Sequence, residues 1–74
     1  MDEAALRVKL GAAIRERRMA LAVSQEGFAD AIQMHRTYYS SIERGERNLT
    51  LVTLWRVAEG LEVKVSQLLR DAGL

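Results

Sequence analysis

The stretch from Ser24 to Gly45 contains two sets of apolar residues, each of which fits only a short helix. Phe28 and Ile32 stand four positions apart, and Tyr39 and Ile42 stand three positions apart. Both spacings place the paired side chains on one face of a helix. Isolated helices shorter than roughly 12–15 residues are only marginally stable in water. We therefore expect these two helices to pack against the rest of the chain, which serves as their scaffold.

Local signals mark the ends of this helix pair. Ser24, with Glu26 close behind it, is typical of the residue that caps a helix N-terminus. Met34 lies in the short link and can fill the angle between the helices. Gly45 is typical of the position just past a helix C-terminus. The sequence thus predicts two helices joined by a tight turn over about residues 24–45.

The outer face of the second helix would carry mostly hydrogen-bonding side chains if Tyr39 and Ile42 point inward. The expected outward residues are Arg36, Thr37, Tyr38, Ser40 and Ser41. Arginine can bond guanine in the major groove of DNA, threonine can bond a base and contact the thymine methyl group, and serine can bond bases or phosphates. These side chains predict a helix that reads DNA. The alternative is a polar surface helix without a ligand. The residues alone do not favour either interpretation.

Length and composition narrow the other choices. The 74 residues are enough for one small domain, residues 1–74. Because the chain has no proline and only five glycines, few residues interrupt helices, and an all-α fold is expected. Without cysteine the chain offers no disulfide or thiolate metal site, which fits a cytoplasmic location. No apolar run is long enough to span a membrane.

Catalysis is not expected. The chain has no recognisable pair of catalytic carboxylates, nucleophile with a base, or glycine-rich phosphate loop. His35 is the only histidine, and no cysteine, aspartate or second histidine stands near it to build a metal site. We therefore expect no enzyme activity, no metal and no cofactor, and assign His35 to helix capping or a phosphate contact.

The remaining segments predict three scaffold helices. They are expected at about 4–22, 51–60 and 65–71. The expected apolar stripes are Leu6, Leu10, Ile14 and Leu21 in the first of these helices, and Leu51, Leu54, Val57, Ala58 and Leu61 in the second. The net charge is only +1. A basic face would therefore depend on how the arginines are distributed, with one group at 15–18 and another at 36–47.

The motif resembles the helix-turn-helix of the lambda-repressor and Cro-like family, also called the XRE family. The resemblance is carried by the SQExxA start at Ser24, by Met34 in the turn and by the IERGER ending at Ile42. The run HRTYYSSIERGERNLTL is most similar to controller proteins of restriction–modification systems. The resemblance covers about residues 10–69 and implies a compact five-helix DNA-binding domain with a central helix-turn-helix. The family usually has glycine early in the turn, where this chain has Gln33, so an altered or strained turn is expected.

Family resemblance also implies roles for individual residues. Arg36 and Thr37 become the principal base readers, and Tyr38, Ser40 and Ser41 mixed base and phosphate contacts. Gln25 matches the family position that contacts a phosphate and often braces the first residue of the reading helix. From their positions at the two ends of that helix, the other expected contacts to the DNA backbone are His35, Arg44, Arg47 and Asn48. Arg18 is expected to form a structural ion pair with Glu43, against the alternative of two independent surface charges.

A second apolar face predicts self-association. Trp55 and Val52 fall outside the expected inward stripe of their helix, and the last helix carries more apolar surface than so short an element can bury. We expect a homodimer through residues 50–71, with Val52, Trp55, Leu68 and Leu69 in contact. The alternative is that Trp55 folds back over its own core.

A symmetric dimer would read an inverted-repeat operator in double-stranded DNA. The controller resemblance implies regulation of the protein's own gene and of an endonuclease gene, at the bacterial or phage nucleoid, with RNA polymerase as a further candidate contact. An XRE-type antitoxin, or a phage or plasmid repressor that regulates its own operon, is the alternative.

Overall fold

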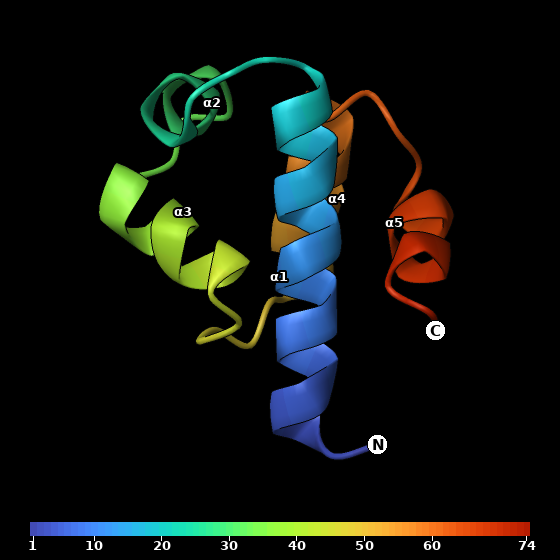
Figure 1. The fold of residues 1–74 in the computed structure, drawn as a ribbon. Coiled ribbons are helices and arrows are strands. Elements are labelled where there is room, and N and C mark those ends of the chain that lie inside the picture. Colours follow the sequence, from blue (N-terminus) through green and yellow to red (C-terminus); the bar gives the residue numbers. More distant parts are fainter.

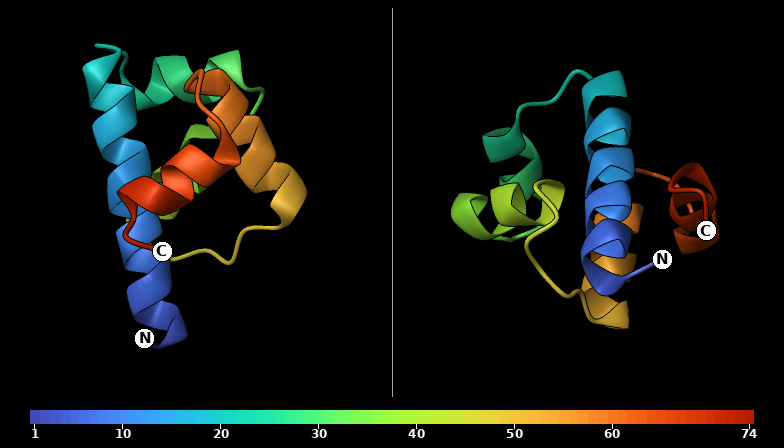
Figure 2. Two further views of the ribbon diagram at one scale, coloured as in Figure 1. Left: turned by 90° about the vertical axis from the view of Figure 1, so that its right-hand side faces the viewer. Right: turned by 60° about the horizontal axis from the view of Figure 1, so that its bottom comes forward.

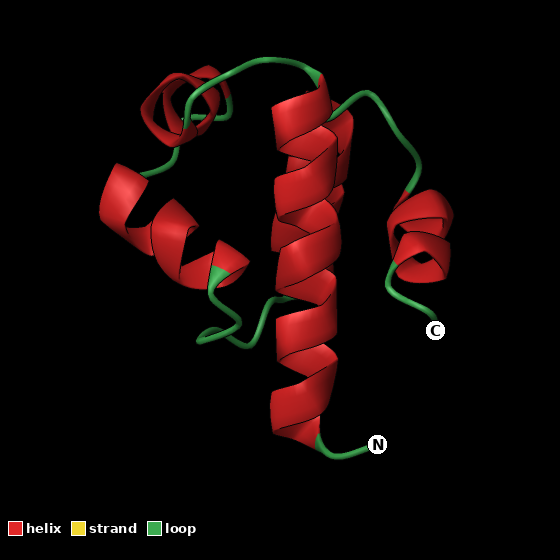
Figure 3. Ribbon diagram, in the orientation of Figure 1, coloured by secondary structure: helices red, strands yellow, loops and turns green.

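The computed structural model describes residues 1–74 as five helices joined by loops, without a strand (Figures 1 and 3). The helices are α1 (Glu3–Ala20), α2 (Gln25–Ala31), α3 (Arg36–Glu43), α4 (Leu51–Gly60) and α5 (Val65–Asp71). This confirms the expected all-α fold with a central helix-turn-helix. None of the five helices combines the length and apolarity that a membrane-crossing helix requires.

Helix α1 is the axis of the arrangement. Helices α2 and α3 lie on one side of α1, and α5 lies on the other side (Figure 1). Helix α5 contacts both α1 and α4, and the left view of Figure 2 shows it lying across them. The two short motif helices are therefore supported by a scaffold made of the other three, as their length requires.

Side-chain caps begin three of the helices. Ser24 Oγ accepts a hydrogen bond from the backbone N–H of Gly27 at 3.0 Å, and Thr50 Oγ1 accepts one from Thr53 at 3.1 Å. Asp2 caps α1 in the same way. His35 occupies the corresponding position before α3, but its side chain makes no capping bond. The capping role expected of His35 is therefore absent.

The core lies where α1, the motif helices and the last two helices meet. Its members include Ile14, Phe28, Tyr39, Ile42, Val57, Leu61 and Leu68. The Phe28 and Tyr39 rings lie 5.1 Å apart between centroids, so the two motif helices share one aromatic contact. Met34 packs against this core from the turn.

Several apolar residues differ in exposure from the sequence-based expectation. Leu68 is fully buried in the core, so its expected role as a dimer contact is wrong. Leu51 was expected in the inward stripe of α4, yet 74% of its surface is exposed. It is the first residue of α4, one turn before the part of that helix that the core covers. Leu6 and Leu21, which lie near the two ends of α1, are also exposed.

The end of α3 lies directly against the backbone of α1. A Cβ atom at Gly11 would stand 2.5 Å from the carbonyl oxygen of Ile42 and 2.6 Å from that of Glu43. Gly45, just after α3, has a φ of 76°, and a Cβ there would lie 2.7 Å from the Cα of Val8. Both positions therefore require glycine for the two helices to approach this closely.

The turn between α2 and α3 adopts the conformation for which the family uses glycine. Gln33 has a φ of 56°. Its backbone N–H donates to Asp30, and the N–H of Met34 donates to Ala29, which closes the end of α2. The turn geometry is thus retained although a side chain occupies a left-handed position, and this costs energy.

Candidate nucleic-acid interface

A buried carboxylate holds the C-terminal end of α3 to the scaffold. Glu43 accepts hydrogen bonds from Arg18 at 2.6 Å (Nε) and 3.1 Å (Nη2), so the two residues form a bidentate ion pair. The Tyr39 hydroxyl and Gln25 Nε2 also donate to Glu43. Arg18 Nη1 donates to the carbonyl oxygen of Val23 at 2.7 Å. The structure thus brings together the two residues expected to pair, and adds donors from α2 and α3.

The network keeps Glu43 ionised. Burial by itself raises the pKa of Glu43, but the hydrogen bonds from Arg18, Tyr39 and Gln25 together outweigh burial and hold this pKa below its ordinary value. Burial raises the pKa of Tyr39, and the bond to Glu43 raises it further, so this hydroxyl stays a donor. A carboxylate held this way fixes α3 against both α1 and α2.

Gln25 bridges the motif helices. Its Nε2 donates to Glu43 at 2.8 Å, and its Oε1 accepts from the Ser40 hydroxyl at 2.9 Å. The family resemblance suggested a brace to the first residue of the reading helix. In this protein the bracing reaches the second half of α3 instead, so the first turn of α3 is not held by Gln25.

The N-terminal end of α3 is open to solvent. His35, Arg36 and Thr37 are exposed, and Tyr38 and Ser40 are half-buried. None of the first three makes a side-chain hydrogen bond or an ion pair within the protein; their polar groups face solvent. The base-reading residues expected at this tip are therefore available to a ligand.

Ser41 departs from its expected place on the outer face. It is only 3% exposed, and its hydroxyl donates to the Tyr38 carbonyl and accepts from Arg47 Nε at 2.9 Å. The expectation that Ser41 faces outward is wrong, because the last turn of α3 is drawn against the scaffold by Ile42 and Glu43.

Arg47 is positioned by α3. Besides the bond to Ser41, its guanidinium lies 5.2 Å from the centroid of the Tyr38 ring, a cation–π arrangement. The Arg47 side chain remains exposed. Its guanidinium is therefore already oriented, and its terminal nitrogens can bind an anion without rearrangement of the side chain.

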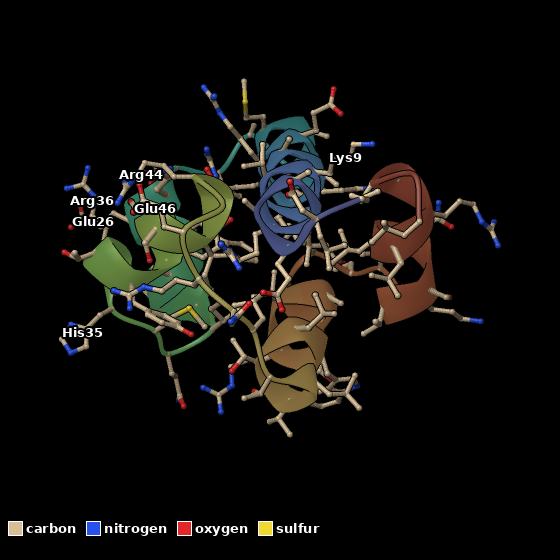
Figure 4. All side chains as sticks on the ribbon, turned by 90° about the horizontal axis from the view of Figure 1, so that it is seen from below. Lys9, Glu26, His35, Arg36, Arg44 and Glu46 are labelled. Carbon is tan, nitrogen blue, oxygen red and sulfur yellow. The ribbon has the colours of Figure 1, made fainter.

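The loop after α3 pairs two of its own charges. Arg44 donates to Glu46 at 3.0 Å (Nε) and 3.2 Å (Nη2), and these side chains are 55% and 57% exposed. Figure 4 shows Arg36, Arg44, Glu26 and Glu46 on the α2–α3 side of the molecule. Hydrogen bonds from Arg44 hold the pKa of Glu46 below its ordinary value, so the acid is charged at neutral pH.

Asn48 lies further along the same loop. Its Oδ1 accepts a hydrogen bond of 3.3 Å from Nη1 of Arg7 in α1, a residue that no sequence pattern singled out. Asn48 remains exposed. Arg7 therefore fixes the far end of the loop that carries Arg44 and Arg47.

The arginines late in α1 are mostly occupied by ion pairs within the protein. Arg18 is buried, and Arg17 pairs with Asp71 at 2.6 Å, which ties α1 to α5. Of that group only Arg15 is exposed without an ion pair. The sequence carried no signal for the Arg17–Asp71 pair, because the partners stand 54 residues apart.

A separate apolar surface lies on α4. Leu51, Val52 and Trp55 are 74%, 65% and 54% exposed. Trp55 therefore does not fold back over its own core. Leu69, the other expected contact besides Leu68, is half-buried.

These features define a class of protein. The chain belongs to the helix-turn-helix family, whose sequence pattern matches residues 14–68. Within this family the chain is similar to the control protein C.MunI of Mycoplasma sp., at 51% identity over 49 residues. That match covers 66% of this chain and 66% of C.MunI, so the chain spans just under two thirds of that relative's length.

Two solved structures have the same fold. The restriction–modification controller protein C.Esp1396I, solved as a tetramer in complex with its natural 35 base-pair operator, is 33% identical. The match covers 93% of this chain and 96% of that one, with a TM-score of 0.79. The clp gene regulator ClgR from Corynebacterium glutamicum is 32% identical over 92% of this chain and 87% of its own, with a TM-score of 0.89.

Proposed function

We propose that this protein is a homodimeric controller protein of a restriction–modification system, which binds an inverted-repeat operator with the N-terminal end of α3 in the major groove. The observation that carries the proposal is the contrast within α3. Its C-terminal end is fixed by the Glu43 network, whereas Arg36 and Thr37 project from its other end without partners. Base recognition requires unoccupied donors on a helix whose position is fixed, and α3 combines the two.

The base readers in this proposal follow from exposure. Arg36 and Thr37 read bases, with Arg36 able to donate two bonds to one guanine. Tyr38 and Ser40 are half-buried, so they contribute mixed contacts at the edge of the groove. Ser41 is excluded from this role by its burial.

Contacts to the sugar–phosphate backbone flank these readers. Arg47 is the best prepared, because Ser41 and Tyr38 hold its guanidinium in place. The other proposed backbone contacts are Gln25, His35, Arg44 and Asn48. Such contacts set affinity and register but carry little sequence information.

Dimerisation in this proposal uses the apolar surface of α4. Leu51, Val52 and Trp55 form the centre of the contact, and Leu69 lies at its margin. An exposed tryptophan among aliphatic side chains is typical of the anchor of a protein interface. A two-fold axis through this surface would present two copies of α3 to successive major grooves, about 34 Å apart.

The regulatory role rests on the similarity to control proteins. We expect the operator to lie upstream of the protein's own gene and an endonuclease gene, with activation at one occupancy and repression at a higher one. The protein would then act in the cytoplasm at the nucleoid, and activation would involve a contact with RNA polymerase.

Selection of bound sequences from a random duplex pool, at near-physiological salt, tests the proposal. We expect an inverted repeat whose half-sites are separated by about one helical turn. Selection repeated with Arg36→Ala should lose the preference at one position of each half-site. Recovery of no enriched sequence by the unaltered protein would overturn the proposal.

A more general gene regulator is the second candidate, because the fold matches ClgR with a TM-score of 0.89, against 0.79 for the controller protein C.Esp1396I. The recovered operator separates the two candidates. A controller's operator would occur beside genes for a nuclease and a methyltransferase, whereas another regulator's operator would occur beside unrelated genes.

A further inference from the structure

The α2–α3 surface and the loop after it carry balanced charge. Within residues 25–47 the exposed arginines are Arg36, Arg44 and Arg47, and the exposed acids are Glu26, Asp30 and Glu46. Non-specific affinity for DNA comes almost entirely from cations that neutralise phosphates. On a surface without excess positive charge, the placement of each acid therefore influences how strongly random DNA is held.

Glu46 differs from the other two acids in its contact. It is the only one of the three in an ion pair with an arginine, and it takes the Nε and Nη2 donors of Arg44 together. This is the two-point geometry with which an arginine grips a phosphate. While Glu46 is in place, that edge of the Arg44 guanidinium is occupied.

We propose that Glu46 is an internal competitor of DNA phosphate for Arg44, and so limits the affinity of this protein for DNA of any sequence. The proposal rests on the proposed function, since it concerns the same DNA surface. Both side chains are more than half exposed, and exposed ion pairs contribute little to stability. A phosphate can therefore displace Glu46, but the carboxylate must move and its charge stays near the DNA backbone.

The contrast with Arg47 supports this assignment. Arg47 is held by a neutral hydroxyl and an aromatic ring, which orient its guanidinium without an ion pair to a carboxylate. Arg44, two residues before the acid, is oriented by a carboxylate that cancels its charge. One of the two arginines next to the reading helix is thus ready for phosphate, and the other is restrained.

Binding to a random-sequence duplex over a range of salt concentrations tests the proposal. For Glu46→Gln we expect the affinity to rise roughly fivefold at about 0.15 M salt, with the logarithmic salt dependence steeper by about 0.9, as for one additional phosphate contact. Glu16→Gln removes the same charge on the α1–α5 side, beside Arg17 and Asp71, and should leave both quantities unchanged.

The proposal requires that the effect of Glu46 on DNA binding depend on Arg44. In an Arg44→Ala background, Glu46→Gln should have little effect, because the restrained cation is gone. An unchanged affinity of the single Glu46→Gln variant would overturn the proposal. So would an equal gain in the Arg44→Ala background, since Glu46 would then act as a plain negative charge. Absence of duplex binding by the unaltered protein at low salt would instead reject the proposed function, and this inference with it.

Discussion

The two ends of α3 differ in burial and in hydrogen bonding. At the C-terminal end, Tyr39, Ile42 and Glu43 are buried, and Glu43 alone accepts four hydrogen bonds. At the N-terminal end, Arg36 and Thr37 are exposed and have no partner in the protein. One end therefore determines where the helix lies, and the other end determines what it can bind. Substitutions should separate the two functions: changes at the C-terminal end should alter stability, and changes at the tip should alter DNA recognition.

Glu43→Ala should have the largest effect. It leaves the Arg18 guanidinium buried without its carboxylate, and breaking a buried ion pair on one side costs about 3–5 kcal/mol. Chemical denaturation followed by circular dichroism measures this loss of unfolding free energy. Replacing both partners, Arg18→Met with Glu43→Leu, should recover most of the stability, because no buried charge remains. A single variant as stable as the unaltered protein would show that the network does not fix this end.

Acid should weaken the same end of the helix. The pKa of Glu43 in the folded protein lies below its ordinary value, so the contribution of this residue to stability is complete above the ordinary carboxyl range. It is lost as the pH falls through the lowered pKa, because a protonated carboxyl no longer pairs with Arg18. Unfolding free energies measured between neutral and acid pH should fall less steeply for Glu43→Gln than for the unaltered protein. Parallel curves would exclude Glu43 as a source of acid sensitivity.

At the tip, Arg36→Ala should change recognition without changing stability. We expect a loss of about 1–3 kcal/mol in binding to the selected operator, and a much smaller loss on random DNA. The unfolding free energy should stay within about 0.5 kcal/mol of its original value, as for most surface substitutions. Arg70→Ala, on α5 across α1 from the motif, removes an equal charge and serves as the control. Equal losses on both DNAs would make Arg36 a phosphate contact.

Gln33→Gly should have the smallest effect. Glycine relieves the left-handed conformation at φ 56° but adds freedom to the unfolded chain, so we expect a net gain of about 0.5 kcal/mol. Thermal unfolding measures this gain, and operator affinity should not change. Ala31→Gly, two residues earlier in the last turn of α2, should destabilise by about 0.5–1 kcal/mol. A loss of stability in Gln33→Gly would mean that the Gln33 side chain contributes a contact.

The sequence predicted most of the backbone correctly. Within α3, it predicted the N-terminal end better than the C-terminal end. Ser24 and Gly45 marked helix ends correctly, because caps depend on local chemistry. The exposure of Arg36 and Thr37 was also predicted correctly, from the inward-facing spacing of Tyr39 and Ile42. The burial of Ser41 was not predicted; in the structure Arg47, from the loop after α3, donates a hydrogen bond to the Ser41 hydroxyl.

Periodicity also failed where it had to choose between two apolar faces. Leu68 and Leu51 are both leucines on amphipathic helices, yet one is buried and the other is exposed. Their surroundings depend on how α4 and α5 pack, which spacing alone does not specify. The Arg17–Asp71 pair depends on the same packing, so it became visible only in three dimensions.

Gly11 has a consequence for how this regulator can change over time. Its Cα faces the carbonyl oxygens of Ile42 and Glu43, so backbone atoms set the spacing between α1 and α3. Side chains in a core can be exchanged in compensating pairs, but a contact between backbones has no such freedom. Substitutions among the surrounding core side chains should therefore not change how far α3 projects from the scaffold. Under the proposed function, new operator preferences can arise at positions 36 and 37 while the depth to which the helix enters the groove stays constant.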